Sequence, residues 1–270
     1  MRELNIEWSD AEVFNHSFQS KSLLNPQTGA DDLSIALRKV AQLPRIKALR
    51  LTGSFILSKE FFNIITSESE QSEWPSLEIL NLQLSSMTPS GGWYYTGDPN
   101  STDPNDERSY DSEDEEEVID SANSDVEDYP AVWEWVKLNG ERPNHFWRNR
   151  PDPEVYNPFL LEMILSVSRM PSLRNLTLQI GSMGTSQVTD FEYRIAGSKS
   201  SNLRHISLES DMEVFEWPRW DLLLTQVKSS YDGEATDWDI PQELKQAITN
   251  ITGSEVNRFN IWNGNRLVKI

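Results

Sequence analysis

The sequence predicts an α/β fold in which parallel strands form one face and helices cover the other. Three observations predict this class. A spaced apolar triplet recurs along the 270 residues, and its last two members alternate as they would on one side of a strand. Amphipathic stretches with helical spacing precede several of the triplets. A strongly acidic stretch interrupts the pattern once, so we expect the repeated units to lie on both sides of an insertion.

The triplet is an apolar residue followed by apolar residues three and five positions later. Four clear copies and a fifth, weaker one are Ile46, Leu49, Leu51; Leu77, Leu80, Leu82; Leu173, Leu176, Leu178; Leu203, Ile206, Leu208; and Val256, Phe259, Ile261. Leu4 and Ile6 look like the tail of a further copy. If neighbouring strands pair in register, one interior row should contain Leu49, Leu80, Leu176 and Ile206.

Four helices are expected between these strands, each with a capping residue or a proline at its start. The expected starts are Asp32, Ser58, Asn157 with Pro158, and Pro241. The corresponding apolar faces are Leu33, Ala36, Leu37 and Val40; Phe61, Ile64 and Ile65; Phe159, Leu160, Met163, Ile164 and Val167; and Leu244, Ala247, Ile248 and Ile251.

Consecutive units begin 31 residues apart at Pro44 and Pro75, and 30 apart at Pro171 and Ser201. Helix–strand units with this period are typical of an irregular, leucine-rich-repeat-like solenoid, with parallel strands on one face and helices on the other. The alternative is an ordinary α/β domain whose strands merely look alike. The first strand has no helix before it, so either another element covers that edge or an upstream part is missing.

The net charge of −19 is concentrated in one stretch. Residues 103–128 contain 13 acidic residues and one basic residue, which contributes −12 and leaves −7 for the rest of the chain. Such a stretch repels itself and has little to bury, so it should be a disordered insertion. The expected organisation is N-terminal repeat units at 1–99, an acidic disordered insertion at 100–130, a Trp-rich connecting segment at 131–156, and C-terminal repeat units with a cap at 157–270.

Composition excludes several functions. The acidic balance argues against nucleic acid and against an anionic membrane surface as partners. There is no cysteine, only three histidines, no apolar run long enough to span a membrane and no visible secretory signal. No phosphate loop, nucleophile elbow or zinc motif is present. We therefore expect an intracellular protein, cytoplasmic or nuclear, that is not an enzyme and needs no cofactor or metal.

The candidate site is the open face of the predicted sheet. Side chains between the buried positions of each strand should point to this face, where most are polar and can hydrogen-bond to a protein partner. The partner-binding residues expected there are Arg50, Asn81, Gln83, Thr177, Gln179, His205, Glu209, Arg258 and Trp262. Two tryptophan clusters, at 133–147 and 217–220, either pack the insertion and the cap onto the fold or form an aromatic binding surface.

Three segments of the chain resemble the C-terminal, leucine-rich-repeat-like region of fungal F-box proteins. They are residues 74–82 (WPSLEILNL) running into 88–99 (TPSGGWYYTGDP); the acidic stretch that follows; and residues 146–153 (FWRNRPDP) with 157–161 (NPFLL) and 170–174 (MPSLR). Their order also matches that family, and together they span most of the chain.

The resemblance implies a substrate-recognition region of a ubiquitin-ligase receptor. In that family an F-box near the N-terminus binds a Skp-type adaptor and the repeats recruit a substrate. No F-box pattern is visible before the first strand here, so the adaptor would be a partner only if an F-box lies upstream. Recognition of an unknown protein partner is the function expected. The alternatives are a hydrolase-like α/β enzyme with an unrecognised site, and a truncated remnant of a longer F-box protein.

Overall fold

The computed structural model describes residues 2–8, 13–63, 74–100, 136–181, 187–194, 219–226, 241–252, 260–263 and 266–269. The acidic stretch at 103–128 and the fourth triplet lie outside these ranges, as do His205, Glu209 and Arg258. Within the described part the chain forms an α/β fold with a four-strand parallel sheet and helices.

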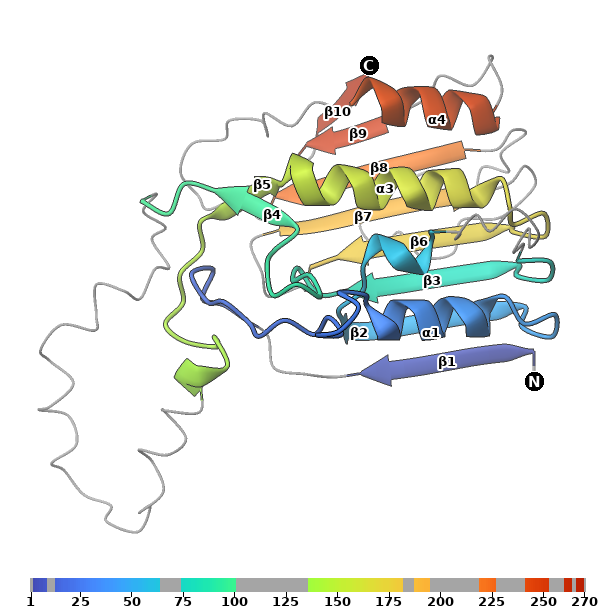
Figure 1. Ribbon diagram of the computed structural model, residues 1–270. Coiled ribbons are helices and arrows are strands. Elements are labelled where there is room, and N and C mark those ends of the chain that lie inside the picture. The colour runs from blue at the N-terminus through green and yellow to red at the C-terminus, as the bar shows by residue number, and fades with distance from the viewer. Residues whose placement is uncertain are drawn as a thin grey trace, which may run out of the picture.

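One eight-stranded sheet organises the molecule, in the order β1-β2-β3-β6-β7-β8-β9-β10 (Figure 1). Its strands are β1 (Glu3–Trp8), β2 (Ala48–Phe55), β3 (Ile79–Leu84), β6 (Asn175–Ile180), β7 (Gln187–Arg194), β8 (Arg219–Gln226), β9 (Asn260–Asn263) and β10 (Arg266–Lys269). The first four strands in this order pair in parallel. Strand β7 is antiparallel to both neighbours, β8 and β9 are parallel, and β10 is antiparallel to β9.

Helices α1 (Asp32–Ala41), α3 (Pro153–Val167) and α4 (Gln242–Thr252) lie with the 3-10 helix η1 (Lys59–Phe61) on one face of this sheet (Figure 1). Helix α3 packs against both η1 and α4, and α1 packs against η1. None of these helices is long and apolar enough to cross a lipid bilayer.

The predicted interior row is confirmed for its described members. Leu49 lies opposite Leu80, and Leu80 lies opposite Leu176, with Leu4 extending the row onto β1. The three central leucines are fully buried. The fourth predicted member, Ile206, lies outside the described residues.

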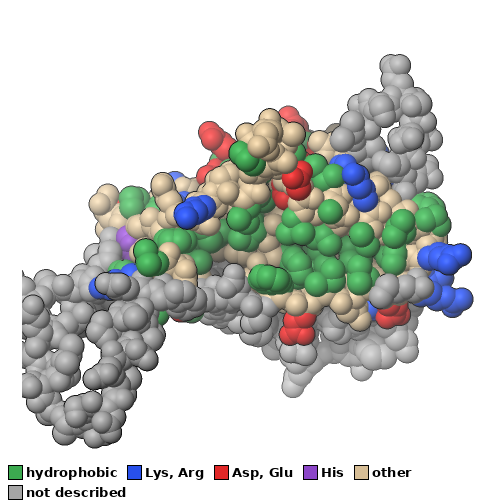
Figure 2. Space-filling view, turned by 60° about the horizontal axis from the view of Figure 1, so that its bottom comes forward, with side chains coloured by type: hydrophobic (Ala, Val, Ile, Leu, Met, Phe, Trp, Pro, Cys, Tyr) green, Lys and Arg blue, Asp and Glu red, His purple; other side chains and the backbone are tan. Residues whose placement is uncertain are grey.

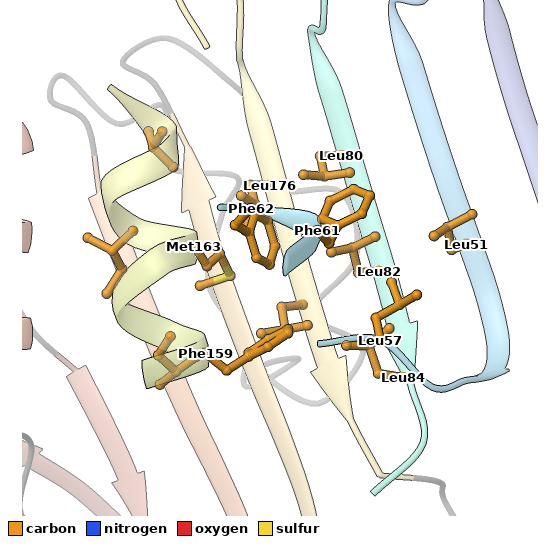
Figure 3. Close-up of a cluster of buried hydrophobic side chains, with 14 of the residues drawn as sticks. Leu51, Leu57, Phe61, Phe62, Leu80, Leu82, Leu84, Phe159, Met163 and Leu176 are labelled. Carbon is orange, nitrogen blue, oxygen red and sulfur yellow. The ribbon is translucent and has the colours of Figure 1, made fainter. Parts of the chain in front are cut away.

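Aromatic side chains from the helix layer close the core over this row. Phe61 and Phe62, at the end of η1, point toward the sheet beside Leu80 and Leu82 (Figure 3). The two rings lie edge to face, with their centroids 4.9 Å apart. The ring of Phe62 makes a similar contact with that of Phe159 on α3, with a centroid distance of 5.5 Å. Edge-to-face contacts of this kind add to the burial of the apolar surface itself. The core is therefore continuous from the parallel strands through η1 to α3.

Two of the predicted helix N-caps, Asp32 and Asn157, are wrong. Helix α1 begins at Asp32 but is capped by Asp31, whose carboxylate accepts from the Ser34 N–H. Helix α3 begins at Pro153 with Asp152 as its cap, so Pro158 lies inside the helix rather than at its start. Pro153 at the first helical position costs no hydrogen bond, because the amide there lacks a helical partner in any case, whereas Pro158 has no N–H to donate to the Glu154 carbonyl one turn earlier.

The other two predicted starts agree better with the structure. Ser58 caps η1 by accepting from the Glu60 N–H, although η1 is a single 3-10 turn rather than the α-helix expected. Pro241 immediately precedes α4, whose predicted residues Leu244, Ala247 and Ile248 are buried.

The predicted apolar stripe of α1 is mostly not the face that the helix buries. Of its four members only Leu37 is buried, whereas Leu33 remains 47% exposed. Polar contacts set the rotation of the helix. The Ser34 hydroxyl donates to Asp31, and the Arg38 guanidinium donates to the carbonyls of Glu60 and Asn63. These bonds direct Ser34 and Arg38 inward, toward the segment that follows β2.

The expectation of an entirely parallel sheet is wrong at β7, a strand that the sequence did not predict and that runs antiparallel to both of its neighbours. Only six residues separate β6 from β7. A parallel pair needs a crossover of about a dozen residues or more, whereas an antiparallel pair needs only a short turn. The length of the connection therefore requires β7 to return beside β6. Ile261 of the fifth triplet lies on β9, paired with Leu222 of β8.

A second, two-stranded sheet brings together the two sides of the acidic stretch. Strand β4 (Tyr95–Gly97) pairs antiparallel with β5 (Arg148–Pro151), with Thr96 opposite Arg150. The chain between β4 and β5 thus leaves and re-enters the fold at one place.

Candidate protein-interaction surface

The open face of the sheet carries an in-register row of polar residues. Asn5, Arg50, Asn81 and Thr177 lie directly opposite one another on β1, β2, β3 and β6. They alternate with the buried leucines, so their side chains point away from the helix layer. Gln83 and Gln179 form a second, shorter row beside the first. The structure therefore brings together five of the nine predicted site residues.

The other four predicted residues are not part of this group. His205, Glu209 and Arg258 lie outside the described residues. Trp262 lies on β9, with its backbone opposite Leu223 of β8. Because β7 and β8 separate β9 from β6, Trp262 is displaced by two strands from the polar rows.

Arg50 is held in place by its neighbours on β1. Its guanidinium donates to the Glu3 carboxylate at 3.4 Å and to the Asn5 side-chain oxygen at 3.3 Å. An exposed ion pair contributes little to stability, about 0–1 kcal/mol. The effect of these contacts is to orient the guanidinium, whose remaining donors can bind a carboxylate or carbonyl of a partner.

Asn81 is the residue of this row with an unsatisfied acceptor. Its Oδ1 atom is buried, and no donor in the described part of the chain reaches it. Leaving a buried acceptor without a donor costs about 1–3 kcal/mol. A rotation of the Asn81 side chain toward the open face would let a partner N–H or O–H supply the missing bond.

Gln83 supports the sheet through its side-chain oxygen. Its Oε1 accepts from the Gly53 N–H at 3.2 Å. Gly53 lies where the pairing of β2 with β3 becomes irregular, and its φ of +112° is one that glycine adopts readily. A Cβ at this position would lie 1.8 Å from the Trp8 carbonyl oxygen, so β1 and β2 approach closely here.

Three charged residues form a cluster that was not anticipated from the sequence. The cluster lies where the chain enters the sheet, at the beginning of three strands. The Glu78 carboxylate pairs with Lys47 and lies 3.9 Å from Arg174. The hydrogen bond from Lys47 lowers the pKa of Glu78. The three residues precede β2, β3 and β6, at equivalent positions in the three units. The sequence feature that could have predicted this cluster is the charged residue immediately before each of the three apolar strands.

A second cluster lies beside β4 and β5 and is formed by His16, His145, Trp93, Trp147 and Arg148. The Arg148 guanidinium lies over the Trp147 ring at 4.0 Å and over the Trp93 ring at 5.2 Å. It also donates to the His16 and Tyr95 carbonyls, at 3.0 Å each. The sequence did not reveal this cluster because its members come from three segments, at residues 16, 93 and 145–148, that are far apart along the chain.

His16 is neutral in this environment. Burial, with the neighbouring Arg148 charge and His145, lowers its pKa to about 3. Its Nδ1 accepts from the backbone N–H groups of Trp147 and Arg148 at 2.9 Å each. Because Nδ1 is an acceptor from both amides, protonation there would break both bonds. His16 thus fixes the segment after β1 to the start of β5.

Ser17 and His145 form a hydroxyl–imidazole pair next to His16. The Ser17 Oγ lies 3.0 Å from His145 Nδ1 and accepts from the Trp147 Nε1–H at 3.3 Å. The same contacts would orient a nucleophilic hydroxyl or simply fasten two segments together. The fastening role accounts for them directly, because the neighbouring His16 bonds join the same two segments.

A groove lies on the helix side of the structure. It has a volume of about 480 Å³ and lies between the ends of α3 and α4. Its lining consists of Leu165, Val167, Ser168, Met170, Pro171, Leu173, Ala247, Asn250 and Ile251. Across the described residues, no group of three or more His, Asp or Glu side chains is arranged to hold a metal ion.

Comparisons with family models, with curated proteins and with solved structures find no match for this chain. Its class is therefore assigned from the architecture alone: the molecule is an α/β protein with a four-strand parallel sheet and helices.

Proposed function

We propose that this chain is a non-catalytic protein–protein interaction module, built as a leucine-rich-repeat-like solenoid and resembling the substrate-recognition region of fungal F-box proteins. One observation carries the proposal: the in-register polar row of Asn5, Arg50, Asn81 and Thr177 on the face of the sheet opposite α1, α3 and α4.

The row suits recognition of an extended protein segment. Neighbouring strands lie about 4.8 Å apart, so the row presents polar groups at a regular spacing across the sheet. The oriented Arg50 guanidinium can bind acidic or carbonyl groups, and the Asn81 acceptor favours a donor at the next position. Arginine is also a residue type that contributes strongly at protein interfaces.

The repeat architecture is supported by the similarity of three consecutive parallel units. Each of the strands β2, β3 and β6 follows a helix and a turn, and each carries buried leucines at corresponding positions. Each unit buries its leucines only because its neighbours lie beside it, as in repeat proteins.

Site-specific photo-crosslinking tests the recognition face. A photo-reactive amino acid at Thr177 should capture a discrete partner in extracts of cells that express the protein, whereas the same group at Glu154 on α3 should not. The Arg50→Glu substitution, which reverses the charge within the row, should reduce capture at Thr177 at least fivefold. Equal capture from both positions, or capture insensitive to Arg50→Glu, would contradict the proposal.

The relation to F-box proteins is tested separately. We expect no binding of a Skp-type adaptor to these 270 residues, because no F-box pattern precedes the repeats. Titration of the purified adaptor by isothermal calorimetry measures this directly. Binding in the micromolar range would show that the chain contains an adaptor site that lacks the F-box pattern.

A further inference from the structure

The outer edge of β1 is open for pairing. The strand is the first in the sheet order, and no strand of the described chain lies beyond it. The Arg2 carbonyl accepts from the N–H groups of Lys47 and Ala48, on the β2 side. Because successive residues of a strand direct their backbone groups to opposite sides, those of Glu3, Asn5 and Glu7 point away from β2.

An exposed apolar surface adjoins this edge. The helix layer begins over β2, so no helix of the described chain covers β1 (Figure 1). Figure 2 shows the result, a continuous hydrophobic area over β1 and α1. Trp8, Leu33 and Leu43 are 58%, 47% and 51% exposed, and Leu4 and Ile6 are only partly buried. A contiguous area of this kind marks an interaction site more often than scattered exposed residues do.

The charges of β1 indicate what can occupy the edge. Glu3 and Glu7 are exposed on either side of Asn5, and Glu7 has no cationic partner among the described residues. A second copy pairing antiparallel about Asn5 would place each Glu3 opposite a Glu7. Like charges directly opposite destabilise a strand pair. With a net charge of −19 on each copy, self-pairing is disfavoured further.

We propose that the β1 edge binds an extended segment of a partner protein in which basic and apolar residues alternate, as an additional strand of the sheet. The basic side chains of this segment lie beside Glu3 and Glu7 on the open face. Its apolar side chains continue the row of Leu4 and Leu49 beyond β1, on the side of the sheet where α1 lies. Backbone hydrogen bonds provide affinity, and the alternation provides selectivity.

Fluorescence anisotropy with a defined probe tests this proposal. The probe is a labelled, N-acetylated peptide with the sequence Lys-Val-Lys-Val-Lys-Val-Lys, titrated with the full chain. The control peptide has the same composition in the order Lys-Lys-Lys-Lys-Val-Val-Val, so its net charge is identical. We expect the alternating peptide to bind at least tenfold more tightly, since only it presents one basic and one apolar side.

Two substitutions place the binding at the edge. Glu7→Lys should weaken the alternating peptide about fivefold, whereas Glu154→Lys, with the same charge change on α3, should have less than a twofold effect. Asn5→Pro removes an outward-facing N–H, while Asn5→Ala keeps it; both lose the contact to Arg50. Only the proline variant should weaken binding severalfold beyond the alanine variant.

The outcomes separate the possible occupants. Equal binding of the two peptides, or equal effects of Glu7→Lys and Glu154→Lys, would overturn the proposal in favour of general attraction to the acidic chain. A dimer seen by analytical ultracentrifugation that dissociates in Asn5→Pro would overturn it in favour of a second copy. The comparison of Glu7→Lys with Glu154→Lys remains decisive even if Asn5→Pro lowers the stability of the fold.

Discussion

Arg50 of β2 and Asn81 of β3 lie directly opposite each other on the open face of the parallel sheet. Arg50 is held by Glu3 and Asn5, whereas the Asn81 Oδ1 atom is buried without a donor from the described chain. Arg50 is thus held in one orientation, whereas the Asn81 side-chain oxygen lacks a hydrogen bond. This combination is unfavourable for the isolated fold and favourable for a surface that binds a partner.

Replacing Asn81 should have opposite effects on the stability of the fold and on the binding of a partner. We expect Asn81→Leu to raise the free energy of unfolding by about 1 kcal/mol, because it removes a buried acceptor without a donor. The same substitution should reduce crosslinking at Thr177. Urea denaturation measures the first effect. Asn81→Asp serves as the control and should destabilise, since it places a charge at the same site. A loss of stability in Asn81→Leu would show that the amide is satisfied in the free protein.

The interior row should be the main contributor to stability. Leu80 is fully buried between Leu49 and Leu176, so Leu80→Ala should cost about 2–5 kcal/mol in unfolding free energy. The matched control is Leu165→Ala on the exposed side of α3, which should cost less than about 1 kcal/mol. Chemical denaturation compares the two. Similar losses would mean that Leu80 does not occupy the shared interior.

Asp31 should matter more than Asp32, although Asp32 is the cap that the sequence predicts. The Asp31 carboxylate accepts from the N–H groups of Ser34 and Ser58, at 3.1 Å each, and so joins α1 to the start of η1. We expect Asp31→Ala to cost about 2 kcal/mol. Asp32→Ala, which loses an exposed bond to Asn25, should cost about 0.5 kcal/mol. The reverse order in thermal or urea unfolding would contradict the observed cap.

His16 should make the fold sensitive to acid. Its pKa is lowered from 6.5 to about 3 in the folded chain. The resulting stabilisation is fully present above pH 6.5. It falls as the pH decreases from 6.5 toward 3, because only the unfolded state binds the proton. The slope approaches about 1.4 kcal/mol per pH unit.

The variant His16→Asn isolates this contribution. Its side-chain oxygen can accept from the amides of Trp147 and Arg148 but does not titrate between pH 3 and 7. The difference in unfolding free energy between wild type and variant should therefore shrink as the pH falls from 6.5 to 4. A difference that stays constant over this range would show that His16 is protonated in the folded state.

Deleting residues 103–128 should leave the melting temperature nearly unchanged. Strands β4 and β5 pair on either side of this stretch, so its removal shortens one surface connection to roughly half. Halving a flexible loop changes the free energy of closure by only about 0.6 kcal/mol, in the stabilising direction. Differential scanning calorimetry compares the deletion with a chain in which a Gly/Ser linker of equal length replaces the stretch. A loss above about 2 kcal/mol in both would show that the acidic stretch packs on the fold.

Much of the parallel sheet could be predicted from the sequence because strand periodicity is a local property. The spacing of Leu49 and Leu51, repeated at Leu80 and Leu176, determines which side chains face inward and hence which register buries them all. The same alternation correctly placed Arg50 and Asn81 together on the opposite face.

Other features depended on contacts between segments that are distant in the chain. Bonds from Asp31 and Arg38 to the segment after β2 set the rotation of α1, so its apolar stripe faces outward in part. The cluster of His16 and Arg148 joins positions more than 130 residues apart.

The sequence by itself therefore determined the inward and outward faces of the first parallel strands, since a two-residue period leaves only one way to bury the leucines. The tertiary structure alone decided where β7 returns, which face of α1 is buried and that β1 forms one edge of the described sheet. These depend on connection length and on polar contacts between remote segments, neither of which follows from the local hydrophobic pattern.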